Sequence, residues 1–310
     1  MIIVENRSWL GILRSVRGTT LQKTWGRLAL AVISSTVATY LHLAYGFFEH
    51  DLTLAPFQLI GLALGIFLGF RNNASFDRFW EGRKLWGQIV NSSRSATRLI
   101  LSTVGPAEVT DEVKLRHREL VYHVIAWVHA LRHGLRRHDK LEELEPFLDP
   151  VECEALREET NRPNAIISHL SLMLRQDVER GWLDKLHHCA IESELNQLVN
   201  SQGGCERIKS TPIPYVYTVL LHQVVAVYCF ALPFGLVHSI GDLTPFVVLL
   251  VAYAFFSLDA VGDELEDPFG EDPNDLPLAT ISRMIEVNLR ERLREEDKPS
   301  LLKPVKNTLM

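Results

Sequence analysis

The sequence has few of the features that mark soluble enzymes or disulfide-rich secreted domains. Its four cysteines lie far apart and form no Cys-x-x-Cys pair, so neither a zinc knuckle nor a disulfide framework is predicted. No Gly-rich phosphate loop, His-Glu-x-x-His pair or nucleophile elbow stands in a supporting context. The net charge of -6 over 310 residues is unremarkable. We expect neither an enzyme nor a nucleic-acid partner.

Four long stretches of the chain contain no charged residue, two before its polar central segment and two after it. Residues 28–48, 52–70, 215–240 and 243–258 contain no Asp, Glu, Lys or Arg. A helix of about 20 residues crosses a hydrocarbon core of about 30 Å, and uncharged runs of this length are unusual in the cores of soluble proteins. The sequence therefore predicts four transmembrane helices, the last of them short and ending at Asp259.

Basic residues orient the predicted spans. Lys and Arg precede the first run, follow the second and precede the third, whereas residues 49–54 and 239–244 contain neither. Because Lys and Arg near span ends favour the cytoplasm, both termini are predicted to be cytoplasmic.

The runs divide the chain into five predicted segments. These are a cytosolic N-terminal segment at 1–27, spans one and two at 28–70, a helical cytosolic domain at 71–214, spans three and four at 215–260, and a cytosolic C-terminal segment at 261–310. Inside the cytosolic domain, apolar residues with helical spacing predict one buried helix face at Leu120, Val124, Trp127, Val128 and Leu131. No internal repeat is visible, which weighs against an inverted-repeat transporter.

The second run carries two stripes with helical i, i+4 spacing. One stripe is Gly61, Gly65 and Gly69, and the next is Leu62, Ile66 and Phe70. Glycines let membrane helices approach closely, which suits a tightly packed ring of helices, and the bulky stripe would then form a dry constriction at the ring axis. Ordinary helix packing with Leu, Ile and Phe facing lipid explains the same pattern.

Three segments resemble the bestrophin family. Residues 71–87, read as RNNASFDRFWEGRKLWG, resemble its signature, and residues 267–275, read as DPFGEDPND, resemble its Asn-Pro-Phe-Gly followed by an acidic run. Residues 213–218, read as IPYVYT, are a weaker match. The resemblance implies an all-α integral membrane protein of bacteria, a homopentameric channel in the inner membrane with four membrane helices per subunit.

The resemblance also assigns pore residues. The family's hydrophobic neck falls on Leu62, Ile66 and Phe70, and we place its second, cytosolic constriction at Leu186. The implied activity is passive conduction of small monovalent ions. Chloride is favoured by resemblance, and cation conduction stays open because an apolar neck carries no formal charge. The expected partners are further copies of the chain, membrane lipid and the permeant ions.

Metal binding and two rival functions complete the expectations. In eukaryotic bestrophins the acidic run forms a calcium clasp, and here Glu271, Asp272 and Asp275 are its counterparts, although Pro273 and Asn274 interrupt the run. A solvated acidic loop is the alternative, so no cofactor is certain. A secondary transporter would need polar groups and broken helices at the bilayer midplane, and a membrane-embedded enzyme would need clustered catalytic residues.

Overall fold

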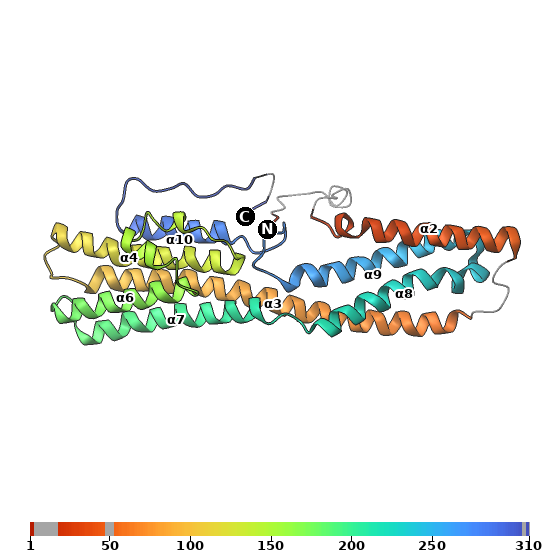
Figure 1. Cartoon of the computed structure of the whole chain (residues 1–310), viewed down its shortest axis with the longest axis horizontal. Helices are drawn as coiled ribbons and strands as arrows, with labels where there is room; N and C mark the ends of the chain where they lie inside the picture. Colours follow the sequence, from red (N-terminus) through yellow and green to blue (C-terminus); the bar gives the residue numbers. More distant parts are fainter. Residues whose placement is uncertain (3–17, 47–52, 306–307, 310) are drawn as a thin grey trace. The chain divides into compact units, whose positions relative to one another are not determined.

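The computed structural model describes residues 1–2, 18–46, 53–305 and 308–309, and in this part of the chain the regular structure is helical (Figure 1). This confirms the predicted all-α class. The α-helices are α2 (Leu21–Tyr45), α3 (Leu54–Thr103), α4 (Asp111–Arg136), α5 (Pro150–Ala155), α6 (Arg162–Glu179), α7 (Lys185–Ser210), α8 (Tyr215–Ile240), α9 (Thr244–Glu266) and α10 (Leu278–Arg292). Two short 3₁₀ helices are η1 (Leu141–Glu143) and η2 (Gly241–Leu243).

The chain forms two compact units. The apolar unit comprises Val4–Phe79 and Pro212–Pro268, and the polar unit comprises Met1–Ile3, Trp80–Thr211 and Phe269–Met310. Helix α3 contributes its first part to the apolar unit and its second part to the polar unit. The predicted topological boundaries at 27, 70, 214 and 260 stay predictions.

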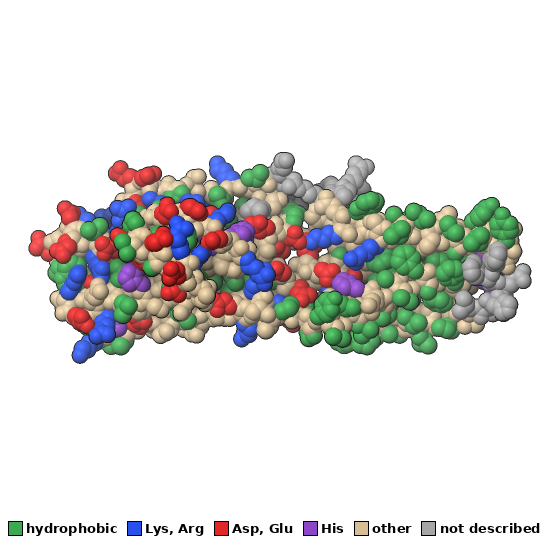
Figure 2. Space-filling model, viewed as in Figure 1, with side chains coloured by type: hydrophobic (Ala, Val, Ile, Leu, Met, Phe, Trp, Pro, Cys, Tyr) green, Lys and Arg blue, Asp and Glu red, His purple; other side chains and the backbone are tan. Residues whose placement is uncertain are grey.

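In the apolar unit, α2, α8, α9 and the first part of α3 pack side by side (Figure 1). Buried apolar residues of all four helices form one core, for example Ala31, Leu64, Val225 and Phe256. Figure 2 shows hydrophobic side chains gathered on the outer surface of the same helices. A helix bundle that is apolar inside and outside is typical of a protein embedded in lipid.

The apolar runs lie in helices that are longer than the runs. Three helical stretches are long and apolar enough to cross a membrane within the described residues: Leu21–Tyr45, Leu54–Thr103 and Tyr215–Glu266. The third contains α8, η2 and α9, so predicted spans three and four form a nearly continuous helical run. The count of four spans therefore stays a prediction. Residues 47–48 and 52 of the predicted runs lie outside the described residues.

Two predicted span ends are not helix ends. Span two was expected to end at Phe70, but α3 continues to Thr103, and α9 continues past Asp259 to Glu266. Hydropathy detects where the apolar segment stops, whereas helix formation depends on backbone hydrogen bonds and propensity, which Arg, Glu and Lys satisfy well. Polar residues therefore extend a membrane helix beyond its apolar part.

In the polar unit, α4 is the central helix. It packs against α6, α7 and α10, and the predicted face from Leu120 to Leu131 is buried as expected. The helix begins after Thr110, whose side chain accepts a hydrogen bond from the Val113 N–H. This cap satisfies one of the free donors of the first turn.

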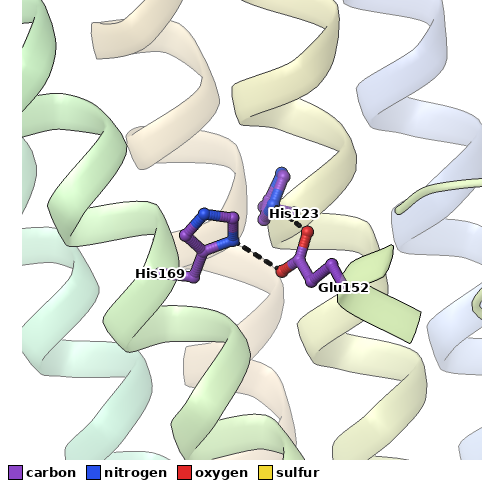
Figure 3. Close-up of side chains that lie close together, drawn as sticks. All are labelled: His123, Glu152 and His169. Carbon is purple, nitrogen blue, oxygen red and sulfur yellow. Dashed lines mark hydrogen bonds and ion pairs between the residues drawn. The ribbon is translucent and has the colours of Figure 1, made fainter. Parts of the chain in front are cut away.

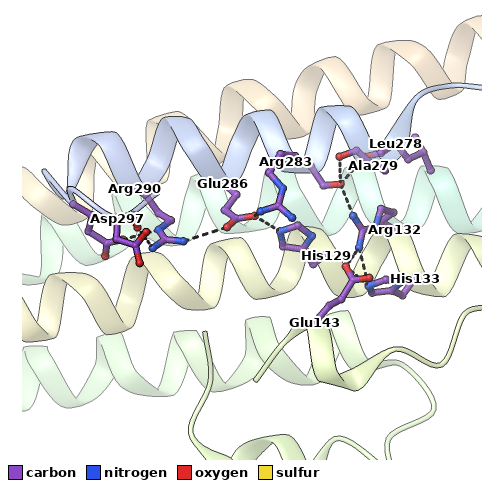
Figure 4. Close-up of polar contacts among 12 residues, drawn as sticks. His129, Arg132, His133, Glu143, Leu278, Ala279, Arg283, Glu286, Arg290 and Asp297 are labelled. Carbon is purple, nitrogen blue, oxygen red and sulfur yellow. Dashed lines mark hydrogen bonds and ion pairs between the residues drawn. The ribbon is translucent and has the colours of Figure 1, made fainter. Parts of the chain in front are cut away.

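Polar contacts join α10 to α4 (Figure 4). His129 Nε2 lies 3.1 Å from a carboxylate oxygen of Glu286, and both side chains are buried. One turn further along α4, Arg132 contacts both the Ser282 hydroxyl and the Glu143 carboxylate. His129 and Arg132 therefore link α4 to Glu286 and Ser282 of α10, and Glu143 ties Arg132 to η1.

Candidate pore helix and its anchoring cluster

The predicted neck residues share one exposed face of α3. Leu62 is 65% exposed, Ile66 is 50% exposed and Phe70 is 63% exposed. Leu64 and Leu68, on another face of the same helix, are 3% and 0% exposed and belong to the core of the apolar unit. The helix therefore buries one apolar face within the subunit and presents the stripe of Leu62, Ile66 and Phe70 outward.

The three glycines of α3 do not form one uniform packing surface. A Cβ atom added to Gly61 would lie 2.6 Å from the hydroxyl oxygen of Tyr228, so Gly61 lets α8 approach within the same subunit. A Cβ added to Gly65 or Gly69 would meet no atom within 4 Å. Gly61 thus has a contact inside the chain, whereas a packing role for Gly65 and Gly69 stays a prediction that requires another molecule.

A buried charge cluster follows the exposed stripe of Leu62, Ile66 and Phe70. The Arg71 side chain is 0% exposed, and its Nη1 donates to Asp259 Oδ1 at 2.8 Å and also contacts Asp263. Asp259 is itself 1% exposed. Gly262 lies between the two acids in α9, and a Cβ there would come 2.6 Å from Asn72 Oδ1, next to Arg71. The glycine therefore lets the Asn72 side chain lie against α9 beside the cluster.

Two further helices reach the same carboxylate. His222 of α8 places Nδ1 2.6 Å from Asp259 Oδ2, and Arg27 of α2 lies 3.5 Å from the same oxygen. Each membrane-type helix of the apolar unit therefore contributes a side chain to this cluster. A buried carboxylate that gathers partners from neighbouring helices fixes their rotation about their axes, because losing any close partner leaves charge unpaired.

The signature residues that follow Phe70 hold α3 against α9. Asn72 Nδ2 donates to the Leu258 carbonyl at 3.0 Å, and Arg78 Nε donates to the Glu266 carbonyl at 3.1 Å. Glu266 in turn accepts from the backbone N–H of Ile213. Arg71 and Asn72 bond to one turn of α9, at Asp259 and Leu258, and Arg78 bonds to Glu266 two turns further along, so this segment holds α3 to α9 at two levels.

Sequence reasoning missed the anchoring cluster. It used the basic residues after the second run, Arg71 among them, as a sign of the cytoplasmic side and Asp259 as the end of a span. The available signal was the i, i+4 spacing of Asp259 and Asp263 directly after an apolar run, since acids at that depth need a cationic partner.

The other predicted site residues lie in the polar unit. Leu186 is 77% exposed in the first turn of α7, where the Asp184 side chain caps the helix by accepting from the backbone N–H groups of Leu186 and His187. An apolar side chain presented at a helix end fits a constriction formed with other subunits, and this role stays a prediction.

The acidic residues at 271–275 do not converge. Asp275 Oδ2 accepts from the backbone N–H of Asp272 at 2.8 Å, and the Glu271 carboxylate faces Arg136 at 3.6 Å and His138 at 3.8 Å. Within the described chain, the sets of three close His or carboxylate ligands lie elsewhere. Calcium binding at Glu271, Asp272 and Asp275 stays a prediction, and it would require these side chains to rearrange.

The apolar helices and the outward stripe define a helical integral membrane protein. Residues 1–291 match the family described as Bacterial/Fungal Bestrophin protein. The chain belongs to the bestrophin family, which confirms the resemblance. The family and the relatives' names point to a non-enzymatic ion channel.

Relatives of known name cover nearly the whole chain. The voltage-dependent anion channel-forming protein RSc3414 of Ralstonia nicotianae is 42% identical over 305 residues, which are 97% of this chain and 96% of that protein. The voltage-dependent anion channel-forming protein YneE of Escherichia coli K12 is 36% identical, and the match covers 98% of each chain. A crystal structure of a bacterial bestrophin homologue from Klebsiella pneumoniae matches with a TM-score of 0.82 and 36% identity, covering 87% of this chain and 98% of that one.

Proposed function

We propose that this protein is a passive anion channel built from five copies of the chain, with α3 of each subunit lining one central pore. The observation that carries the proposal is the exposed stripe of Leu62, Ile66 and Phe70 on a helix whose opposite face is buried. Supporting evidence comes from the relatives named as anion channel-forming proteins.

A ring of subunits accounts for the stripe better than exposure to lipid alone. In a symmetric ring, one helix per subunit supplies the whole wall of a pore, so no subunit needs polar residues along its spans. Rings of bulky apolar side chains form constrictions that conduct when wetted. Gly65 and Gly69, which have open space beside them, would let a neighbouring subunit approach α3.

Selectivity would arise at the aromatic ring rather than at Arg71. Arg71 is fully buried and bound to two carboxylates, so it does not present a free positive charge to the pore. A phenyl ring has a positive edge and a negative face, and a ring of Phe70 side chains that present their edges favours anions. The neck thereby combines a dry barrier with a weak preference for chloride and similar ions.

Single-channel recording from the purified protein in a planar lipid bilayer tests this proposal. We expect discrete unitary currents, and under a potassium chloride gradient a reversal potential near the chloride equilibrium value. A resolvable unitary current needs more ions per second than a transporter can move. The absence of such currents would therefore contradict a channel. Unitary currents that reverse near the potassium equilibrium value would instead contradict anion selectivity while leaving the channel in place.

A further inference from the structure

Three side chains from three helices of the polar unit converge on one point (Figure 3). His123 of α4 places Nε2 3.0 Å from Glu152 Oε2, and His169 of α6 places Nδ1 2.8 Å from Glu152 Oε1. Glu152 lies on α5, and the centres of the two imidazole rings are 5.3 Å apart. One nitrogen from each histidine and a carboxylate oxygen all lie within 4.8 Å of one another.

Both ring nitrogens of His123 face oxygen acceptors. Its Nδ1 lies 2.8 Å from the backbone carbonyl oxygen of Glu119, and a carbonyl can only accept, so Nδ1 carries the proton. A neutral imidazole has one N–H, so Nε2 then turns a lone pair toward the Glu152 carboxylate. The His123 side chain is 7% exposed, and two facing lone pairs in a buried position need a proton or a cation between them.

The second carboxylate oxygen of Glu152, Oε1, also lacks a hydrogen-bond donor. Glu152 Oε1 is buried and has no partner that meets hydrogen-bond geometry within the described residues, although His169 Nδ1 lies 2.8 Å away. Two nitrogens and an under-coordinated carboxylate therefore surround one position. This arrangement suits a bound cation better than a simple chain of hydrogen bonds.

The ligand types indicate which cation. Imidazole nitrogen with one carboxylate is a ligand set for zinc and related transition metals, whereas calcium and magnesium prefer oxygen ligands alone. The Nδ1–H of His123 bonded to the Glu119 carbonyl is also the outer contact that orients a histidine on a metal. The neighbouring Cys153 is not one of the ligand groups that lie within 4.8 Å of one another.

The fourth coordination position has access to solvent. Glu152 and His169 line a pocket of about 470 Å³, whose wall includes the apolar residues Val151, Ala155 and Leu156. His169 is 47% exposed at the side chain, while His123 lies inside. Three protein ligands with one position open to a pocket match a zinc site that also binds water or a small ligand.

We propose that His123, Glu152 and His169 bind one divalent transition-metal ion, with zinc as the preferred ion, and that the ion joins α4, α5 and α6. The site is separate from the acidic residues 271–275 and from the neck. Because three separate elements supply the ligands, zinc would bind the folded polar unit preferentially and stabilise it by an amount that grows with the logarithm of the free zinc concentration above the dissociation constant.

Zinc titration of the full-length protein in detergent tests the site. After treatment with a chelator and its removal, isothermal titration calorimetry with zinc chloride should show one site per subunit, and thermal unfolding should shift upward with added zinc. His169→Ala changes a half-exposed side chain and should fold. We expect it to weaken zinc binding at least about tenfold, since even loss of an outer-shell partner costs about 10- to 100-fold. Glu152→Gln should weaken it similarly.

The control variant is His187→Ala, which removes an exposed histidine that contacts Asp184 on α7. It should bind zinc as the unaltered protein does. Zinc binding of equal strength in His169→Ala and in the unaltered protein would overturn the proposal, as would binding lost only in His187→Ala. No zinc uptake by a correctly folded protein would also overturn it, and calcium chloride in place of zinc should give no comparable heat.

Discussion

Replacing Arg71 by methionine removes the buried cation between α3 and α9 while keeping similar side-chain length. Arg71 and Asp259 are 0% and 1% exposed, and deleting one member of a buried pair typically costs about 3–5 kcal/mol because the other charge is left uncompensated. His222 and Arg27 still contact Asp259 in the variant, so we expect a loss near the lower end, about 3 kcal/mol.

The double variant Arg71→Met with Asp259→Leu separates electrostatics from lost packing. With both charges removed, no unpaired buried charge remains at the pair, and we expect most of the lost stability to return. Guanidinium-induced unfolding in detergent, followed by circular dichroism, measures the four free energies of the cycle. Arg175→Met, which breaks an exposed pair with Glu179, is the matched control and should change stability little.

Two results would refute this reasoning. The first is an Arg71→Met variant as stable as the Arg175→Met control, which would mean that the cluster does not anchor α3. The second is a double variant at least as unstable as the sum of the single variants, which would mean that Arg71 and Asp259 act independently.

The remaining predictions concern selectivity, assembly, pH and calcium. Phe70→Ala should shift the reversal potential under a salt gradient more than Leu62→Ala does, and equal shifts would remove the special role of the aromatic ring. Mass measurement in detergent should give a pentamer, and Gly65→Leu together with Gly69→Leu should shift the mass toward smaller species; a monomer for the unaltered protein would contradict the assembly. Desolvation by burial, and then Arg132, lower the pKa of His133 to about 4. The unfolded chain, with a histidine pKa of about 6.5, therefore binds more protons between about pH 6.5 and 4, and the free energy of unfolding should fall as pH decreases through this window. His133→Asn should reduce that slope in urea unfolding at several pH values, and an unchanged slope would speak against it. Chelation of calcium should leave channel currents nearly unchanged, because Glu271, Asp272 and Asp275 do not converge on one position. Strong activation by calcium would contradict this expectation.

The sequence predicted the features that depend on short-range periodicity. The buried face of α4 and the stripe of Leu62, Ile66 and Phe70 follow from i, i+3 and i, i+4 spacing, which any helix converts into a face. The family resemblance came from contiguous residues, so it too was readable without a structure. The sequence could not show that Gly61 packs inside the subunit while Gly65 does not, because only the position of Tyr228 on α8 distinguishes them.

Features that depend on distant segments were missed for the same reason. His123, Glu152 and His169 belong to three helices with unrelated sequence spacing, and no local pattern marks a ligand set that tertiary packing assembles. Arg71 and Asp259 are separated by most of the chain and meet only because α3 packs against α9. The ends of the helices could not be read from the apolar runs, since the limits of an apolar run report the surrounding medium rather than the last hydrogen bond of the helix.

The central claim is that the exposed stripe of α3 is the narrow part of an ion pathway. Single-channel recording of the variant that combines Leu62→Ala, Ile66→Ala and Phe70→Ala, beside the unaltered protein in the same bilayer, tests it most directly. Smaller side chains widen and hydrate an apolar constriction, so the account predicts larger unitary conductance. A correctly assembled variant with the same unitary conductance as the unaltered protein would contradict the claim and assign the stripe to packing or lipid contact.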